Sequence, residues 1–229
     1  MSYRISKKIF DLSVSIILLL LLLPVIALSC IIICLQAGES PIFIQERGIS
    51  LTKNRFKIYK FRTMKRGIDS NISAYSLSSF LLKPHQKKYV FPFGRFLRKT
   101  GLDELPQLIN VIKGEMSIVG PRPLALEDLE CVKTFYPQLY AERGNINLLP
   151  GITGYWQLNK DEAGSVENLI LMDKIYFQQK SLLLDIKLFL MSISISLTAK
   201  HIDSILSARE NYYITLTTIN NDAIELFDN

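Results

Sequence analysis

Two adjacent carboxylates, Asp103 and Glu104, lie in a segment rich in groups suited to binding an anion. Basic residues precede them at Arg95, Arg98 and Lys99. An ionised aspartate can act as a nucleophile, or as a ligand of Mg²⁺, which at phosphate sites takes one or two carboxylates plus phosphate oxygens. Further along, Arg122 stands between two prolines that restrict its backbone, so its guanidinium has a stiff support suited to two-point phosphate binding. Residues 94–123 therefore indicate a site for an anionic substrate.

We expect the two carboxylates at the start of a helix. Apolar residues recur at i, i+3, i+4 and i+7 and predict one helix face that ends before Gly114; they are Leu105, Leu108, Ile109 and Ile112. Thr100 and Asp103 have the spacing of a capping box, and Pro106 is tolerated near a first turn. The N–H groups and the dipole of a helix N-terminus attract negative charge, including phosphate. On this local pattern alone a second interpretation is equally good, in which Asp103 only caps the helix and the basic residues form a solvated face.

A membrane segment is predicted before this site. Residues 12–35 form an apolar run of 24 residues without a charge, which is long enough for a membrane helix. Pro24 lies at its centre and predicts a kink. Lysines and arginines flank both ends, and the positive-inside rule places both flanks in the cytoplasm, which a re-entrant helix satisfies. An ordinary kinked span remains the alternative.

The remaining chain predicts a mixed domain. Residues 52–66 carry seven basic residues interleaved with aromatic and aliphatic ones, which favours a strand that contacts phosphates or lipid headgroups rather than nucleic acid. Residues 67–92 predict a polar, irregular connection over the site. We further expect helices over 124–135, 166–179 and 182–200, the last in the core or on the membrane surface, and a short strand over 155–158 that follows a turn. The net charge of +6 favours anionic partners, and the three cysteines show no pairing or metal-ligand spacing.

One family resemblance covers most of the chain. Residues 97–124, LRKTGLDELPQLINVIKGEMSIVGPRPL, resemble the signature of bacterial sugar transferases, the monotopic polyprenyl-phosphate phosphoglycosyl transferases. Further similar motifs are KKIFDL (7–12), PIFIQERGI (41–49), FKIYKFRTM (56–64), PGITGYWQLN (150–159) and LMDKIYFQQKSLLLDIKL (171–188). The chain departs from the family pattern where Leu23 replaces a serine before the proline, and around the PGITG element, where Leu149, Lys160 and Asp161 replace an arginine and a glycine-arginine pair.

The resemblance implies an α+β fold: a mostly helical, membrane-associated catalytic domain with a small number of short strands and an N-terminal re-entrant membrane helix. It divides the chain into a hairpin (1–38), a cytoplasmic catalytic domain with interfacial helices (39–200) and a polar tail (201–229). The implied location is the bacterial inner membrane, with the catalytic domain facing the cytoplasm. Asp173, Tyr176 and Asp185 match family positions, where we expect structural roles.

The implied reaction is transfer of a sugar-1-phosphate from a UDP-sugar to undecaprenyl phosphate through an aspartyl-phosphosugar intermediate, with release of UMP. Asp103 would be the nucleophile and contact Mg²⁺, and Glu104 would orient it or handle a proton. The expected phosphate-binding residues are Arg122, Arg98 and Lys60. The expected partners are the UDP-sugar, undecaprenyl phosphate and membrane lipids, without nucleic acid.

Two other classes of function stay open. One is a membrane-anchored polyprenyl-diphosphate phosphatase, which would use the same groups with water as the acceptor. The other is a non-enzymatic scaffold that binds anionic lipid through the basic strand. The sequence also leaves open which sugar is transferred, which glycan pathway is supplied, and whether the chain forms a homo-oligomer.

Overall fold

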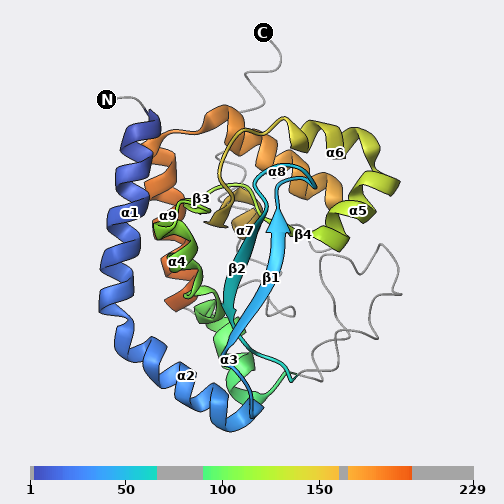
Figure 1. Ribbon diagram of the computed structural model, residues 1–229. Helices are drawn as coiled ribbons and strands as arrows, with labels where there is room; N and C mark the ends of the chain where they lie inside the picture. The colour runs from blue at the N-terminus through green and yellow to red at the C-terminus, as the bar shows by residue number, and fades with distance from the viewer. Residues whose placement is uncertain (1–2, 66–89, 160–164, 198–229) are drawn as a thin grey trace, which may run out of the picture.

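The computed structural model describes residues 3–65, 90–159 and 165–197, and it is a mostly helical α+β structure with short strands (Figure 1). Most of the predicted connection, residues 67–89, lies outside the described residues. The whole predicted tail, 201–229, also lies outside them.

The apolar N-terminal run forms two helices instead of one. These are α1 (Tyr3–Leu21) and α2 (Leu23–Ala37), which are bent relative to each other by 62°. Pro24 falls in the first turn of α2, where a missing N–H is tolerated, so the chain restarts a helix there after a bend. The predicted kink is therefore confirmed. Among the described residues no single helix is long and apolar enough to cross a membrane, but this bent pair together has the required length and composition.

Two small sheets support the body of the molecule. Strand β1 (Ile42–Gly48) pairs antiparallel with β2 (Phe56–Phe61) and with β4 (Leu124–Ala125). Strand β3 (Ser117–Val119) pairs in parallel with β5 (Gly151–Thr153). Strand β2 confirms the strand expected within residues 52–66.

The strand predicted over 155–158 is wrong. The residues there form a short helix, α7 (Tyr155–Asn159), and the strand is the preceding β5. Gly151 permits that pairing, because a Cβ at this position would lie 2.1 Å from the backbone nitrogen of Gly120. A run of four mostly apolar residues does not distinguish a buried strand from a buried helix, which is why the sequence pattern failed here.

The remaining helices are α3 (Pro92–Thr100), the 3₁₀ turn η4 (Leu102–Glu104), α4 (Gln107–Ile112), α5 (Leu126–Phe135), α6 (Pro137–Gly144), α8 (Val166–Gln179) and α9 (Leu182–Leu197). The described helices and strands enclose three apolar clusters, of which the smallest joins α2, β2 and α3. A second cluster joins β2, α4, β3, α8 and α9, and Phe10 and Val14 of α1 pack against it. The third surrounds Trp156 of α7 and takes apolar side chains from α5 and α8.

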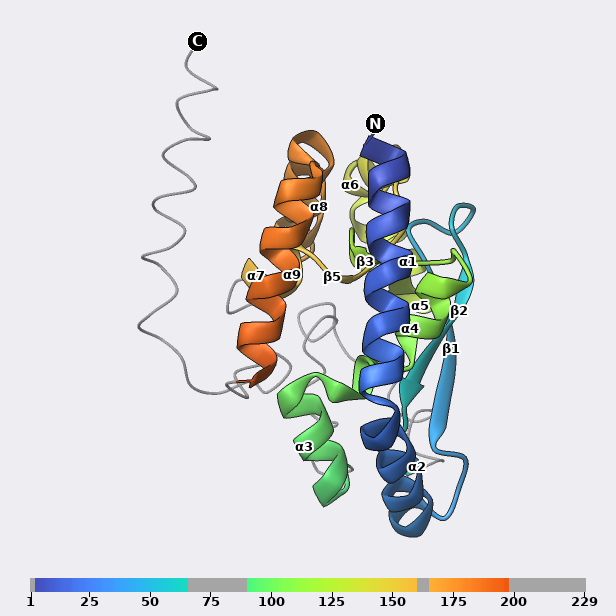
Figure 2. The same cartoon turned by 90° about the vertical axis from the view of Figure 1, so that its left-hand side faces the viewer.

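Helix α1 lies alongside α4 and α9 (Figures 1 and 2), and a polar network also ties it to the domain. The Asp11 carboxylate accepts hydrogen bonds from the Ser117 hydroxyl at 2.8 Å and from the Ile118 amide at 3.1 Å. Lys7 lies 3.0 Å from Asp11 and 3.3 Å from the fully buried Asp185 of α9. The bent pair is therefore fixed to the domain by buried contacts as well as by the chain that follows it.

The predicted apolar face of α4 is only partly correct. Leu108 is buried, but Ile109 and Ile112 are 44% and 37% exposed. The reason is Asn110, whose side chain turns inward and pairs with the backbone of β2, accepting from the Tyr59 amide at 3.1 Å and donating to the Lys57 carbonyl at 2.8 Å. Asn110 therefore takes a buried position on α4 that the hydrophobic periodicity did not predict, and its polar atoms are paired there.

Candidate active site

The two carboxylates lie in the turn between α3 and α4. Helix α3 ends at Gly101, whose φ of 71° is accessible mainly to glycine, and the chain then makes the 3₁₀ turn η4 that contains Asp103 and Glu104. Both side chains are buried, with exposures of 7% and 8%. They precede α4 instead of forming the first turn of one helix that runs to Gly114, so that part of the prediction is wrong.

The predicted capping box does not form. The Thr100 hydroxyl donates to the carbonyls of Phe96 and Leu97, at 2.9 and 3.1 Å, and so bonds back into α3. Neither η4 nor α4 has a side-chain cap. The local interpretation of Asp103 as a simple helix cap therefore loses its support.

Lys60 reaches the carboxylate pair from β2. Its ammonium donates to Glu104 Oε1 at 2.6 Å, and the two side chains are only 15% and 10% exposed. Such a pair is screened less than one on the surface, so the attraction holds both groups firmly in place. Two residues 44 positions apart, both expected at the site, are thus in direct contact.

Arg122 is held by more than its flanking prolines. Its backbone N–H donates to Asp173 Oδ1 at 3.2 Å, and its carbonyl accepts from Arg143. Arg143 and Asp173 form a buried ion pair beneath it. The Arg122 guanidinium carbon lies 4.7 Å from the centre of the Trp156 ring, within the range of a cation–π contact. The stiff support expected from the prolines is completed by this pair and this ring.

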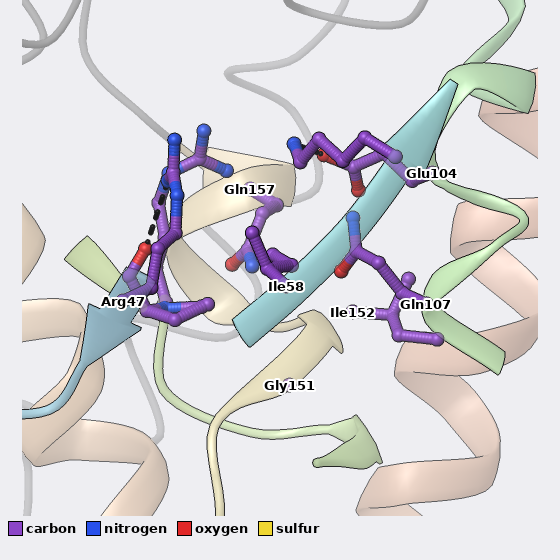
Figure 3. A pocket seen from close by; sticks show the side chains of 10 residues that line it. Arg47, Ile58, Glu104, Gln107, Gly151, Ile152 and Gln157 are labelled. Carbon is purple, nitrogen blue, oxygen red and sulfur yellow. Dashed lines mark hydrogen bonds and ion pairs between the residues drawn. The ribbon is translucent and has the colours of Figure 1, made fainter. Parts of the chain in front are cut away.

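A pocket brings several of these groups together (Figure 3). It is open to solvent on one side and is lined by Arg47, Ile58, Lys60, Glu104, Gln107, Arg122, Pro123, Gly151, Ile152 and Gln157. Of the expected site residues, Lys60, Glu104 and Arg122 line it. Asp103 is not among the lining residues, although it adjoins Glu104 in the same buried turn.

The structure places Arg98 differently. Its Nε donates to the Thr63 hydroxyl at 2.8 Å, and it contacts the sulfur of Met64. It does not line the pocket. Arg98 therefore braces the end of β2 against α3, and its expected contact with phosphate is not part of the pocket described here.

Three polar lining residues were not anticipated as site residues. Arg47 donates to the Pro123 carbonyl at 3.1 Å, next to Arg122, because β1 pairs with β4. Gln107 and Gln157 project amides into the same space (Figure 3). Arg47 and both glutamines stand inside the family-like motifs, but only tertiary pairing shows that they meet.

The donor set fits a magnesium ion shared with a substrate. Among the described residues no three His, Cys, Asp or Glu side chains are grouped to hold a metal. Two neighbouring carboxylates beside cationic groups match the usual magnesium site at phosphates, where the protein gives one or two carboxylates and the phosphates give the rest. Glu104 is paired with Lys60, and Asp103 is the carboxylate that the family resemblance implies as the ligand.

Sequence comparisons identify similar proteins. The family model described as "Bacterial sugar transferase" matches residues 2–199. The chain is 35% identical over 189 residues to the uncharacterized sugar transferase EpsL of Bacillus subtilis, covering 82% of this chain and 86% of that protein. It is 37% identical over 190 residues to the exopolysaccharide production protein ExoY of Sinorhizobium fredii, covering 80% and 81%. It is 33% identical over 199 residues to the UDP-glucose:undecaprenyl-phosphate glucose-1-phosphate transferase of Escherichia coli, covering 83% of this chain and 40% of that protein.

Proposed function

The chain belongs to the bacterial sugar transferase family, and we propose that it transfers a sugar-1-phosphate from a UDP-sugar to undecaprenyl phosphate and releases UMP. The observation that carries the proposal is the pocket, where the Lys60–Glu104 pair and Arg122 surround a space beside the buried Asp103. The names of two relatives, a UDP-galactose-lipid carrier transferase and the E. coli transferase above, support the substrate class. We place the reaction in exopolysaccharide or capsule synthesis, in line with ExoY.

The proposed chemistry has two displacements at one phosphorus atom. The Asp103 carboxylate attacks the β-phosphorus, the bond from that phosphorus to the bridging oxygen breaks, and UMP leaves with the bonding electrons. A phosphate oxygen of undecaprenyl phosphate then attacks the phosphorus of the aspartyl-phosphosugar. The bond to the aspartate oxygen breaks, which regenerates the carboxylate and completes a ping-pong cycle.

The basic residues around Asp103 supply positive charge that the reaction needs. Two anionic substrates must approach a carboxylate in turn, so positive charge has to offset their repulsion and the charge that builds up on phosphate oxygens. Arg122 provides a planar guanidinium on a fixed backbone, and Lys60 holds Glu104 in place. Glu104 accepts a proton from the acceptor phosphate or orients Asp103. Magnesium held by Asp103 and substrate phosphates would supply further charge neutralisation.

We place the α1–α2 pair in the cytoplasmic leaflet of the inner membrane as a re-entrant segment. Its large apolar side chains are exposed to the surroundings, including Leu20 at 67%, Leu21 at 70% and Leu35 at 81%. Exposed apolar surface on this scale is stable in lipid and costly in water. With the pair embedded and the pocket in the cytoplasm, undecaprenyl phosphate presents its phosphate without leaving the bilayer.

The test is UMP release by purified protein reconstituted in lipid with Mg²⁺, undecaprenyl phosphate and a panel of UDP-sugars. We expect UMP from one or two donors, loss of activity with a chelator, and no UMP from the Asp103→Asn variant. In the absence of acceptor, mass spectrometry should detect a phosphosugar on Asp103. A folded, Mg²⁺-supplied protein that releases UMP from no donor would contradict the proposal. Release of inorganic phosphate from undecaprenyl diphosphate would favour a phosphatase instead.

A further inference from the structure

Two side-chain amides in the pocket have buried polar atoms that find no hydrogen-bond partner in the described structure. They are Nε2 of Gln107, a residue that is only 2% exposed, and both Nε2 and Oε1 of Gln157. Figure 3 shows the Gln157 side chain in the middle of the pocket, between Arg47 on one side and Glu104 and Gln107 on the other. Buried polar atoms are almost always paired in native proteins, so three unpaired ones in a single pocket indicate groups that a ligand satisfies.

The chemistry of Gln157 restricts that ligand. Its amide presents an unmet donor and an unmet acceptor side by side, whereas an ionised phosphate oxygen can only accept. A hydroxyl or an acylamino group both donates and accepts. Phosphate instead suits the cations at the pocket, Arg47, Arg122 and Lys60.

The structure around Gln157 holds its side chain in a defined position. It lies on α7, which follows directly on β5 and whose neighbouring residue Trp156 is 1% exposed in an apolar cluster. The same Trp156 ring supports the Arg122 guanidinium. The amide and the guanidinium are therefore fixed relative to each other by one buried side chain.

We propose that Gln157 hydrogen-bonds a hydroxyl or acylamino group of the transferred sugar and so helps to select the sugar, with Gln107 donating to an oxygen of the same sugar phosphate. The inference rests on the proposed function. The pocket adjoins the turn of Asp103 and Glu104, and the attacked β-phosphorus carries the sugar on one side and UMP on the other. We assign the sugar to Gln157, and binding of UDP tests the other assignment.

The experiment compares the wild type with Gln157→Leu and with the less altered Gln157→Met, using Gln178→Leu on the exposed face of α8 as the control. UMP release gives kcat/KM for the donor that the wild type prefers, and for analogues of that sugar that lack one hydroxyl or acylamino group each. Melting temperatures verify that the variants fold. In parallel, isothermal titration measures binding of the same donors and of UDP to the Asp103→Asn protein, with and without Gln157→Met.

We expect each Gln157 variant to lower kcat/KM for the parent donor about tenfold, the usual effect of one lost neutral hydrogen bond. With one particular analogue, wild type and variant should be equal, because the partner group is gone. UDP binding should be unchanged. An equal loss with every donor and analogue, weaker binding of UDP, or no loss at all would overturn the inference while leaving the transferase activity established. Absence of UMP from the wild type with every donor would overturn the proposed function and this inference together.

Discussion

The buried pair Arg143–Asp173 leads to the sharpest prediction about stability. It joins α6 to α8, its two side chains are 0% and 3% exposed, and both of its members also hold the backbone of Arg122. Replacing Asp173 by Asn keeps the side-chain size and retains an oxygen for the Arg122 amide. The change removes the negative charge and leaves a fully buried guanidinium without a counter-charge.

The expected cost follows from that uncompensated charge. Removing one partner of a buried ion pair destabilises a protein by about 3–5 kcal/mol, a large part of a total stability of about 5–15 kcal/mol. For a chain of this length each kcal/mol shifts the melting temperature by about 2–4 °C. We therefore expect Asp173→Asn to melt about 6–20 °C below the wild type. Because Arg122 loses part of its support, the KM for the UDP-sugar should also rise.

The same two helices provide a matched control. Lys174 and Glu142, the neighbours of Asp173 and Arg143, form an ion pair at 3.1 Å, but their side chains are 50% and 47% exposed. Exposed pairs contribute about 0–1 kcal/mol, so Lys174→Met should shift the melting temperature by less than about 4 °C. The melting temperatures of both variants are measured in the same detergent, with intrinsic fluorescence as the signal of thermal unfolding. Equal shifts for the two variants would refute the reasoning from burial.

Three further outcomes are expected. Gly151→Ala should lower the melting temperature and abolish UMP release, because the added Cβ would lie 2.1 Å from the Gly120 nitrogen. Gly144→Ala is the control, since a Cβ added there meets nothing within 4 Å. Equal melting temperatures of the two variants would contradict this prediction. Burial, together with the charge and hydrogen bond of a neighbouring carboxylate, raises the pKa of Tyr176 far above its usual range. The stabilisation that the neutral Tyr176 hydroxyl gives the folded state is therefore full below the unfolded-state pKa of about 10 and is lost as pH rises above it. Tyr176→Phe should accordingly flatten the decline in melting temperature between about pH 9 and 11. An unchanged slope would contradict the raised pKa of Tyr176. Asp11→Ala should make α1 more sensitive to limited proteolysis, since it removes the acceptor for two groups of β3. Protection equal to that of the wild type would show that the Asp11 hydrogen bonds do not hold the helix in place.

Local sequence signals predicted the elements whose boundaries they control. Helix α8 begins where expected because the Ser165 hydroxyl accepts from the Asn168 amide, an ordinary N-cap. The bend near Pro24 follows from one missing N–H. The signals failed where a distant element decided the outcome, as at Asn110, which turns inward to satisfy β2, and at Gly151, which pairs with β3.

The site was predictable in part for the same reason. Lys60, Glu104 and Arg122 carry charge inside family-like motifs, and the structure places all three at one pocket. The contributions of Arg47 and Gln157 could not be predicted, because a pairing between β1 and β4 positions one and an unsatisfied amide identifies the other. Neither feature has a signature in neighbouring residues.

The attachment of α1 also sets an order of events during synthesis. This helix leaves the ribosome before the other described helices, yet Asp11 bonds to a serine 106 residues later and Tyr3 to Asp185, 182 residues later. Some of its polar groups therefore lack their full set of partners until α9, the last described helix, has begun to be made. A version expressed without α1 would not be a freed catalytic domain, because Ser117, Ile118 and Asp185 would face an open seam. The segment that we place in the lipid is also the one that closes the enzyme.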